Sequence, residues 1–193
     1  MFQLVPLASV LQPPEDTERM VGEISKKLIR HNLAHQIVKP GAPLSSESPA
    51  VLLTVTGGTE HMVMQRAKEL QGPIILAAHP SSNSFPAALE VLARLQQLNR
   101  KGKIVMLGDR DEDFLGLQRL LHAVQVHREI SQTRLGVFGE PSDWLIAGPS
   151  DQETMAELFR ARFVKVPMAE IISGMDDIDD EQANGFLRSF VEG

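Results

Sequence analysis

The sequence of 193 residues contains no cysteine. Disulfide bonds, thiolate metal sites and a cysteine nucleophile are therefore excluded, and the composition fits a reducing compartment. The sequence also lacks an apolar run long enough to span a membrane. Its first residues, Met1–Pro6, carry no basic segment followed by a long apolar stretch, so they do not read as a signal peptide. We therefore expect a cytoplasmic protein that has no membrane partner.

Clustered positive charge is also missing. The formal net charge is −6, and the nearest approach to a basic patch is Lys26, Lys27 and Arg30, which read as a solvated helix face. Nucleic-acid binding needs several Lys or Arg side chains that meet the phosphate backbone together. The sequence therefore predicts no nucleic-acid partner, and the lack of a basic recognition helix disfavours a DNA-binding regulator.

Short apolar segments alternate with segments of helical periodicity along the first 130 residues. The run 51–56 is almost wholly apolar, which is typical of a parallel strand buried on both faces. Such alternation implies right-handed β-α-β crossovers, so we predict an α/β fold with a doubly wound parallel sheet of the flavodoxin or Rossmann type. Strands are expected at 2–7, 36–38, 51–56, 73–78 and 103–107.

A second α/β pattern follows residues 131–133, which we interpret as a linker. Strands are expected at Arg134–Phe138 and Phe163–Val166. Two strands make a marginal sheet, so they either join the first sheet or begin another domain. We assign residues 1–130 to a flavodoxin-like domain and residues 131–193 to the beginning of a second α/β domain or a C-terminal extension.

The last expected helix carries an apolar side without a partner. Phe186, Leu187, Phe190 and Val191 lie on one side of this helix and follow the acidic segment 175–180. An uncovered apolar face of this kind marks an interface. We therefore expect a homo-oligomer or a missing C-terminal domain.

The unusual loops follow the expected strands, where open parallel sheets bind their ligands. The paired glycines of Thr56–His61 let a ligand approach backbone N–H groups at a helix N-terminus, although the loop is neither a Walker loop nor a dinucleotide fingerprint. The alternative is a tight turn with Thr59 as N-cap. The loop His79–Ser84 is rich in hydroxyl and amide groups. His79 is either a structural strand-end histidine or a group that binds a sugar hydroxyl or transfers a proton.

Two further loops carry charged or aromatic side chains. The spacing of Asp109, Asp111 and Asp113 is that of an EF-hand start, but Phe114 stands where glycine is required, so capping of a helix is the better interpretation. Trp144 lies beside polar residues, as in a sugar-binding platform or a buried anchor at a domain junction. No metal-ligating residue is assigned.

Three stretches of the sequence resemble the L-fucose isomerase-like proteins, the group that includes L-arabinose and L-fucose isomerases. They are residues 53–60, 79–93 and 135–146. The long central stretch is the most specific of the three, and the glycine motif alone is weak. The resemblance therefore covers strand-loop-helix units from about residue 51 to about residue 147.

The resemblance implies an α/β N-terminal domain and an aldose–ketose isomerase setting in carbohydrate metabolism. In that family a later domain holds a divalent metal, typically manganese, through carboxylate and histidine side chains, and the chains are longer. No equivalent ligand set is found here, so no catalytic residue is carried over. We expect no cofactor in this chain, and manganese only where a C-terminal catalytic domain exists. N-terminal domains of the family help to form oligomers and can close a neighbouring subunit's active site.

The sequence thus predicts the N-terminal portion of a sugar isomerase-like protein, inactive alone, which contributes substrate contacts and oligomer packing. The alternative is a non-catalytic α/β module that binds a small ligand. In either case the small molecule, such as a sugar, is expected in one cleft at the carboxyl edge of the sheet. The residues expected to line that cleft are Gly58, Glu60, His79, Asn83 and Trp144.

Overall fold

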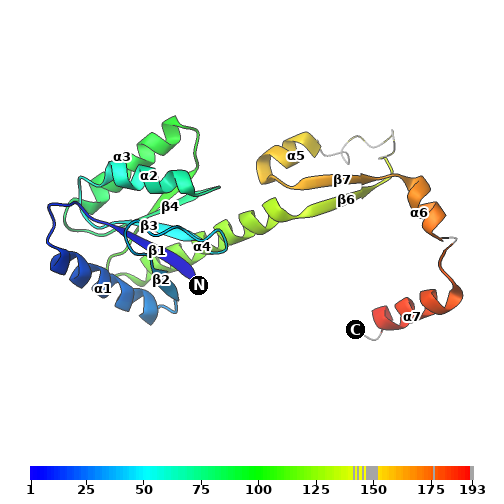
Figure 1. Ribbon diagram of the computed structural model, residues 1–193, viewed down its shortest axis with the longest axis horizontal. Helices are drawn as coiled ribbons and strands as arrows, with labels where there is room; N and C mark the ends of the chain where they lie inside the picture. Colours follow the sequence, from blue (N-terminus) through cyan, green and yellow to red (C-terminus); the bar gives the residue numbers. More distant parts are fainter. Residues whose placement is uncertain (141, 143, 145, 147–151, 176, 192–193) are drawn as a thin grey trace. The chain divides into compact units, whose positions relative to one another are not determined.

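The computed structural model describes residues 1–140, 142, 144, 146, 152–175 and 177–191. The chain divides into two compact units, Met1–Arg128 and Glu129–Gly193, which are described separately (Figure 1).

The interpretation of residues 131–133 as a linker is wrong for its first two residues, because helix α4 (Asp111–Gln132) continues through them. No glycine or proline lies between Gly116 and Thr133 to end the helix earlier.

The first unit is a doubly wound α/β structure, as the sequence predicts. Its five strands form one parallel sheet in the order β2-β1-β3-β4-β5. The strands are β1 (Phe2–Leu7), β2 (His35–Ile37), β3 (Ala50–Thr54), β4 (Ile74–Ala78) and β5 (Gly102–Met106). The helices are α1 (Pro14–Arg30), α2 (Glu60–Glu69), α3 (Ser84–Gln97) and α4.

The strand order reverses between β1 and β3. From β1 the chain passes outward to β2 and then returns to the other side of β1, where Leu4 pairs with Val51 and Leu7 with Thr54. From β3 the chain continues outward to β4 and β5. In open parallel sheets a reversal of this kind opens a crevice at the carboxyl ends of the two strands, and ligands bind there. The fold therefore places the candidate site beside the loops that follow β1 and β3.

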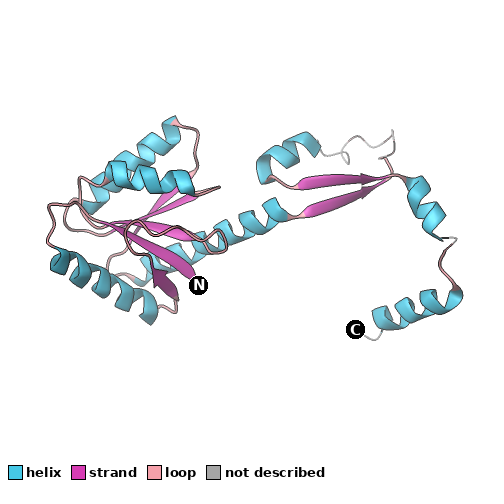
Figure 2. Ribbon diagram, in the orientation of Figure 1, coloured by secondary structure: helices cyan, strands magenta, loops and turns pink. Residues whose placement is uncertain are grey.

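Helices cover both faces of this sheet (Figure 2). Val51 and Leu53 of β3 pack in the cluster that includes α1 and α4, whereas Leu52 packs in the cluster that includes α2 and α3. Alternate side chains of one strand therefore enter two different cores. This arrangement explains why β3 is apolar at every position except Thr54.

Helix α3 carries the apolar residues Phe85, Leu89, Leu92 and Leu95 at helical spacing, and they divide between core and surface. Leu95 is buried and Leu92 packs against the core, whereas Phe85 and Leu89 are exposed. The helix is apolar on several sides, and its small residues allow the closest approach of its backbone to the sheet. The side chains of α3 that are buried are Ser84, Ala87, Ala88, Val91 and Leu95.

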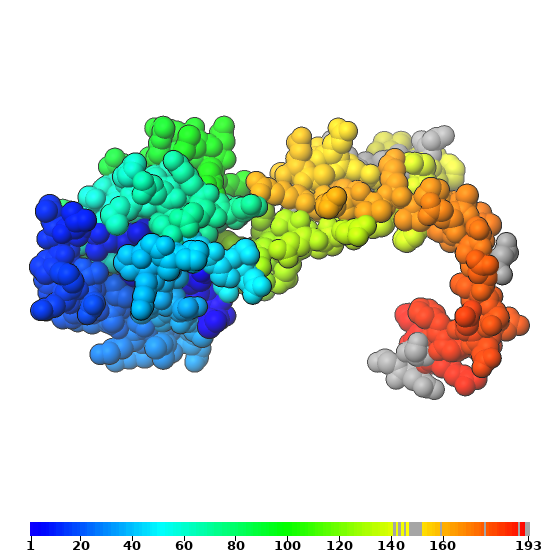
Figure 3. Space-filling model, viewed as in Figure 1, coloured from blue at the N-terminus to red at the C-terminus, as the bar shows by residue number. Residues whose placement is uncertain are grey.

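The second unit has its own sheet of two parallel strands. The strands are β6 (Arg134–Phe138) and β7 (Arg162–Val166), joined through α5 (Gln152–Phe159) and followed by α6 (Met168–Met175) and α7 (Asp180–Val191). In the space-filling view α7, coloured red, projects from the rest of its unit (Figure 3). None of the helices in the described part of the chain has both the length and the apolar character needed to cross a lipid bilayer.

Leu52→Ala is expected to lower the free energy of unfolding of the first unit by about 2–5 kcal/mol, because it leaves a cavity under α2 and α3. Leu115→Ala on α4 is the control. Its side chain is 49% exposed, so a change below about 1 kcal/mol is expected. Urea unfolding followed by amide NMR signals of the first unit measures both. Equal effects of the two substitutions would contradict the assigned core.

Candidate functional site

Three loops meet at the carboxyl edge of the first sheet. The backbone N–H of Ser9, after β1, donates to Oγ1 of Thr56, after β3, at 2.8 Å. The N–H of Gly57 donates to the carbonyl of Ser82, after β4, at 2.8 Å. The loops that follow β1, β3 and β4 are therefore hydrogen-bonded to one another across the point where the strand order reverses.

His79 lies beneath this edge and is only 4% exposed. Its Nε2 is 2.7 Å from the carbonyl of Val55, which accepts a hydrogen bond, so Nε2 carries a proton. Its Nδ1 accepts from the backbone N–H of Ser81 at 3.3 Å and lies 2.9 Å from Oγ of the same residue. These partners assign the donor role to Nε2 and the acceptor role to Nδ1. His79 thus joins the loops after β3 and β4, and neither ring nitrogen is left for a ligand.

Buried hydroxyl groups complete the join between the two loops. Oγ of Ser84 donates to the carbonyl of Thr54 and accepts from the backbone N–H of His79 at 2.9 Å. Oγ1 of Thr54 lies 3.0 Å from the carbonyl of Ala77 and also contacts Ser84. We call the hydrogen bonds among Thr54, Val55, His79, Ser81 and Ser84 the strand-end network. Its buried polar atoms have partners, as stability requires.

Two adjacent glycines serve different purposes in the loop after β3. A Cβ on Gly57 would lie 2.9 Å from Cβ of Asn83, so the backbone of this loop contacts the next loop directly. Gly58 has a φ of +74°, which side-chain-bearing residues adopt at a cost, although a Cβ there would make only an ordinary contact with Oγ of Ser9, at 3.9 Å. Close packing therefore requires glycine at position 57, and the positive φ favours glycine at position 58.

The loop after β4 presents its polar side chains through an unusual backbone. Ser82 and Asn83 have φ values of +56° and +55°, in the left-handed region. Each such residue costs about 1–2 kcal/mol, although asparagine tolerates the region better than most. The bond from Gly57 to Ser82 and the buried Ser84 hold this turn in place. The exposed side chains of Ser81, Ser82 and Asn83 are thus carried on a backbone that the buried network fixes.

Neither site helix is capped by the side chain that its sequence favours. Ser84 before Phe85 and Pro86 is typical of an N-cap, but Asn83 occupies the N-cap of α3, because the hydroxyl of Ser84 is used inside the network. Thr59 is the N-cap of α2, as expected, but its hydroxyl donates to the carbonyl of Thr56 at 2.8 Å and does not cap the helix.

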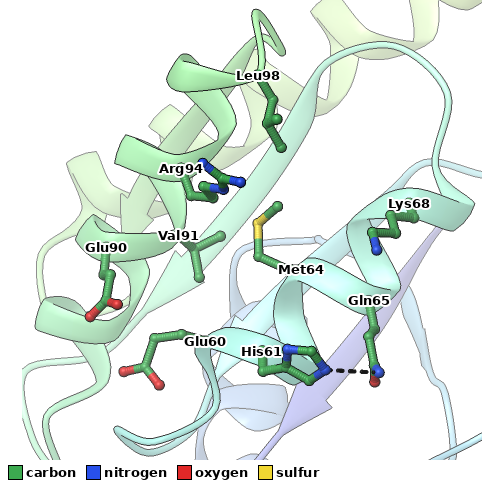
Figure 4. Close-up of a pocket in the computed structure, with 9 residues that line it drawn as sticks. All are labelled: Glu60, His61, Met64, Gln65, Lys68, Glu90, Val91, Arg94 and Leu98. Atoms are coloured by element: carbon green, nitrogen blue, oxygen red, sulfur yellow. Dashed lines mark hydrogen bonds between the residues drawn. The ribbon is translucent and has the colours of Figure 1, made fainter.

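Glu60 is the first residue of α2 and lies beside both the carboxyl edge and a groove. Its carboxylate accepts from the N–H of Gly58 at 3.3 Å, at the carboxyl edge. It also lines a groove of about 530 Å³ between α2 and α3, where Glu60 and Glu90 lie at the same end (Figure 4). No sequence motif marks this groove, because it forms between the outer sides of two helices. Its other lining residues are His61, Met64, Gln65, Lys68, Val91, Arg94 and Leu98.

The charge of the edge is acidic or neutral. The loop residues 8–13, 55–59 and 79–83 include no lysine or arginine. In the loop after β5, Asp109 pairs with Lys27 of α1 at 2.7 Å. The hydrogen bond and the positive charge of Lys27 lower the pKa of the Asp109 carboxyl. Arg110 is likewise paired, with Asp113 at 2.9 Å, and the pairing raises the pKa of its guanidinium. The loops after β1, β3 and β4 therefore offer hydroxyl, amide and backbone groups without a lysine or arginine side chain.

The structure brings Gly58, Glu60 and Asn83 to one edge, with His79 buried below them. Trp144 belongs to the second unit, where it is 79% exposed. The contributions of Ser9, Thr54 and Thr56 were not anticipated, because isolated hydroxyl residues in and after strands give no distinctive sequence signal. The edge is thus a rigid polar surface more than an array of free titratable groups.

Within the described ranges, no three His, Asp or Glu side chains are grouped so that they can hold a metal ion. The residues described here therefore do not fit the manganese ion that the resemblance implies.

Fold and site together define a doubly wound α/β protein whose carboxyl edge is rich in hydroxyl and amide groups. The sequence matches no model of a known protein family and none of the curated proteins with which it was compared.

Ser84→Ala is expected to lower the free energy of unfolding by about 1–3 kcal/mol, because it leaves the N–H of His79 and the carbonyl of Thr54 buried without this partner. Ser46→Ala, at an exposed position, is the matched control and is expected to change stability by less than about 0.5 kcal/mol. Urea denaturation measures both. Indistinguishable midpoints would show that the network contributes nothing.

Gly57→Ala is expected to destabilise the first unit by about 1–3 kcal/mol, because the new methyl group must displace Asn83. Gly22→Ala in α1, where nothing lies within 4 Å, is expected to raise stability by up to about 1 kcal/mol. Thermal melts give the two signs. Amide NMR spectra should show displacement of residues 81–83 in the first variant alone, and an unchanged loop would refute the contact.

Proposed function

We propose that this chain corresponds to the N-terminal portion of an aldose–ketose isomerase-type protein and that its carboxyl edge contacts the sugar. The supporting observation is the arrangement of this edge. Exposed hydroxyl and amide groups stand on a buried hydrogen-bonded base, at the reversal of strand order, in loops that carry no lysine or arginine.

The chemistry of these groups suits a polyhydroxylated ligand. The Asn83 amide both donates and accepts, serine hydroxyls do the same, and the Glu60 carboxylate accepts from hydroxyl groups. A sugar offers neighbouring hydroxyls that pair with such a set without any charge to neutralise. Because the loop backbones are already fixed by the strand-end network, little conformational entropy is lost when a ligand is bound.

The same geometry supports a binding role for this edge. Aldose–ketose isomerisation moves a proton between C1 and C2, which needs an acid or base within reach of the sugar. His79 is buried with both ring nitrogens hydrogen-bonded, so it does not meet this requirement.

A non-catalytic module that binds a small ligand is the second candidate. The buried position of His79 favours it as well, because a binding role needs no free acid or base. The two candidates agree on where the ligand binds. They differ in whether the bound sugar is then isomerised in a larger protein.

The chain by itself is expected to have no isomerase activity. Purified protein is incubated with L-fucose or L-arabinose and manganese, and ketose formation is measured against a heat-denatured sample. Ketose above that background would overturn the assignment of a binding role alone.

Asn83→Gly tests the sugar contact without disturbing the turn, because glycine favours the positive φ of this residue. The matched control is Asn99→Gly, at another asparagine of φ +53° near the far end of α3. Both variants are expected to keep their thermal stability. In NMR titrations with neutral L-sugars, only Asn83→Gly is expected to weaken binding, by about tenfold or 1.4 kcal/mol. Equal affinities in wild type and both variants would exclude Asn83 from the site.

A further inference from the structure

The groove between α2 and α3 carries opposite charges at its two ends. Glu60 and Glu90 lie at one end, whereas Lys68 and Arg94 lie further along the two helices (Figure 4). At about 1.5 Å of rise per residue, Lys68 is about 12 Å along α2 from Glu60. By the same rise, Arg94 is about 6 Å along α3 from Glu90. The acidic and basic ends are therefore separate parts of one surface.

None of these four charges belongs to an ion pair within the described part of the chain, where the ion pairs involve other side chains. Glu90 and Arg94 are one turn apart on α3, a spacing that permits an ion pair. Arg94 instead donates to Oε1 of Gln97 at 2.9 Å. Glu60 accepts from the backbone N–H of Gly58. Both ends therefore remain available to opposite charges on another molecule.

Apolar side chains line the groove as well. Val91 is buried at its base and Met64 is half-buried between the two helices, while Leu98 is 46% exposed beyond them at the basic end (Figure 4). A methionine side chain is flexible and adapts to the surface that packs against it. The groove thus has an apolar centre and a charged border, which is the composition of a protein–protein interface.

The order of the charges makes this surface complementary to a copy of itself. Helices α2 and α3 follow the neighbouring parallel strands β3 and β4, so both helices run in the same direction. A twofold axis perpendicular to the groove reverses this direction in the second copy. The basic end of each copy then faces the acidic end of the other, and the same contact occurs twice, as in an isologous interface.

We propose that two copies of this chain associate through this groove, with α2 and α3 of one copy antiparallel to α2 and α3 of the other. The four helices then enclose Met64, Val91 and Leu98 of both copies. The contact is confined to one side of two helices, so the association is weak, with a dissociation constant of about micromolar order. This inference does not rest on sugar binding. Glu60 also belongs to the proposed sugar site, so the tests leave it unchanged and the two proposals fail separately.

Charge reversal in two separate chains tests the antiparallel arrangement. Glu90→Lys alone, and Lys68→Glu with Arg94→Glu in another chain, are each expected to raise the dissociation constant of the dimer at least about tenfold. An equimolar mixture of the two variants is expected to form a mixed dimer, because the altered end of each chain then faces the altered end of the other. Formation of the mixed dimer also requires both variants to be folded.

Sedimentation velocity measures these constants, with one of the two chains labelled at its N-terminus. The wild type is expected to approach twice the 21.3 kDa mass of one chain as its concentration rises. A wild type that stays monomeric at about 1 mM would overturn the proposal. So would variants that associate as the wild type does, or a mixture that associates no more tightly than either variant alone.

The apolar part of the contact is tested on α3 with a matched pair of substitutions. Leu98 and Leu89 are each 46% exposed, but Leu98 lines the groove and Leu89 does not. Leu98→Asp is expected to raise the dissociation constant at least about tenfold, and Leu89→Asp is expected to leave it unchanged. Thermal melts of both variants show whether each remains folded. Equal dissociation constants in the two folded variants would overturn the proposed contact.

Discussion

The hydrogen bond from Nε2 of His79 to the carbonyl of Val55 is the constraint on which the carboxyl edge depends. Carbonyl groups at the end of a central strand lose their ladder partners and must find others or remain buried at a cost. Here an imidazole from the neighbouring strand supplies the donor, and its second nitrogen anchors Ser81. One side chain therefore satisfies β3 and positions the turn after β4. This buried contact therefore helps to fix the positions of the exposed groups above it.

The sheet order determines which loops this contact joins. Parallel pairing of β1, β3 and β4 brings three carboxyl ends together, and the reversal beside β1 leaves space above them. Gly57 then allows the backbone after β3 to touch Asn83, which a larger residue prevents. The strand-end network holds these loops in place, and the left-handed turn at Ser82 and Asn83 exposes the side chains of the loop after β4.

The sequence predicts the strands well because continuous apolar runs have few other interpretations in a chain of alternating elements. Val51 to Leu53 is buried on both sides, and the pattern shows this directly. The role of His79 was not predictable, because a strand-end histidine looks the same whether its nitrogens face a ligand or a carbonyl. In helix α3 the buried residue Ala87 gives a weaker signal than the exposed residues Phe85 and Leu89, because hydrophobicity follows side-chain size. Both the role of His79 and the packing of α3 depend on which backbone groups come close together in the fold, and the composition does not show this.

The two units differ in how much apolar surface is buried within the chain. In the first, both faces of the sheet are covered by helices of the same chain, so its site is formed without a partner. In the second, most of the described large apolar side chains are exposed, and Ala161 is the one described apolar residue that is buried. The order of the candidate site therefore comes from burial and hydrogen bonds within the first unit.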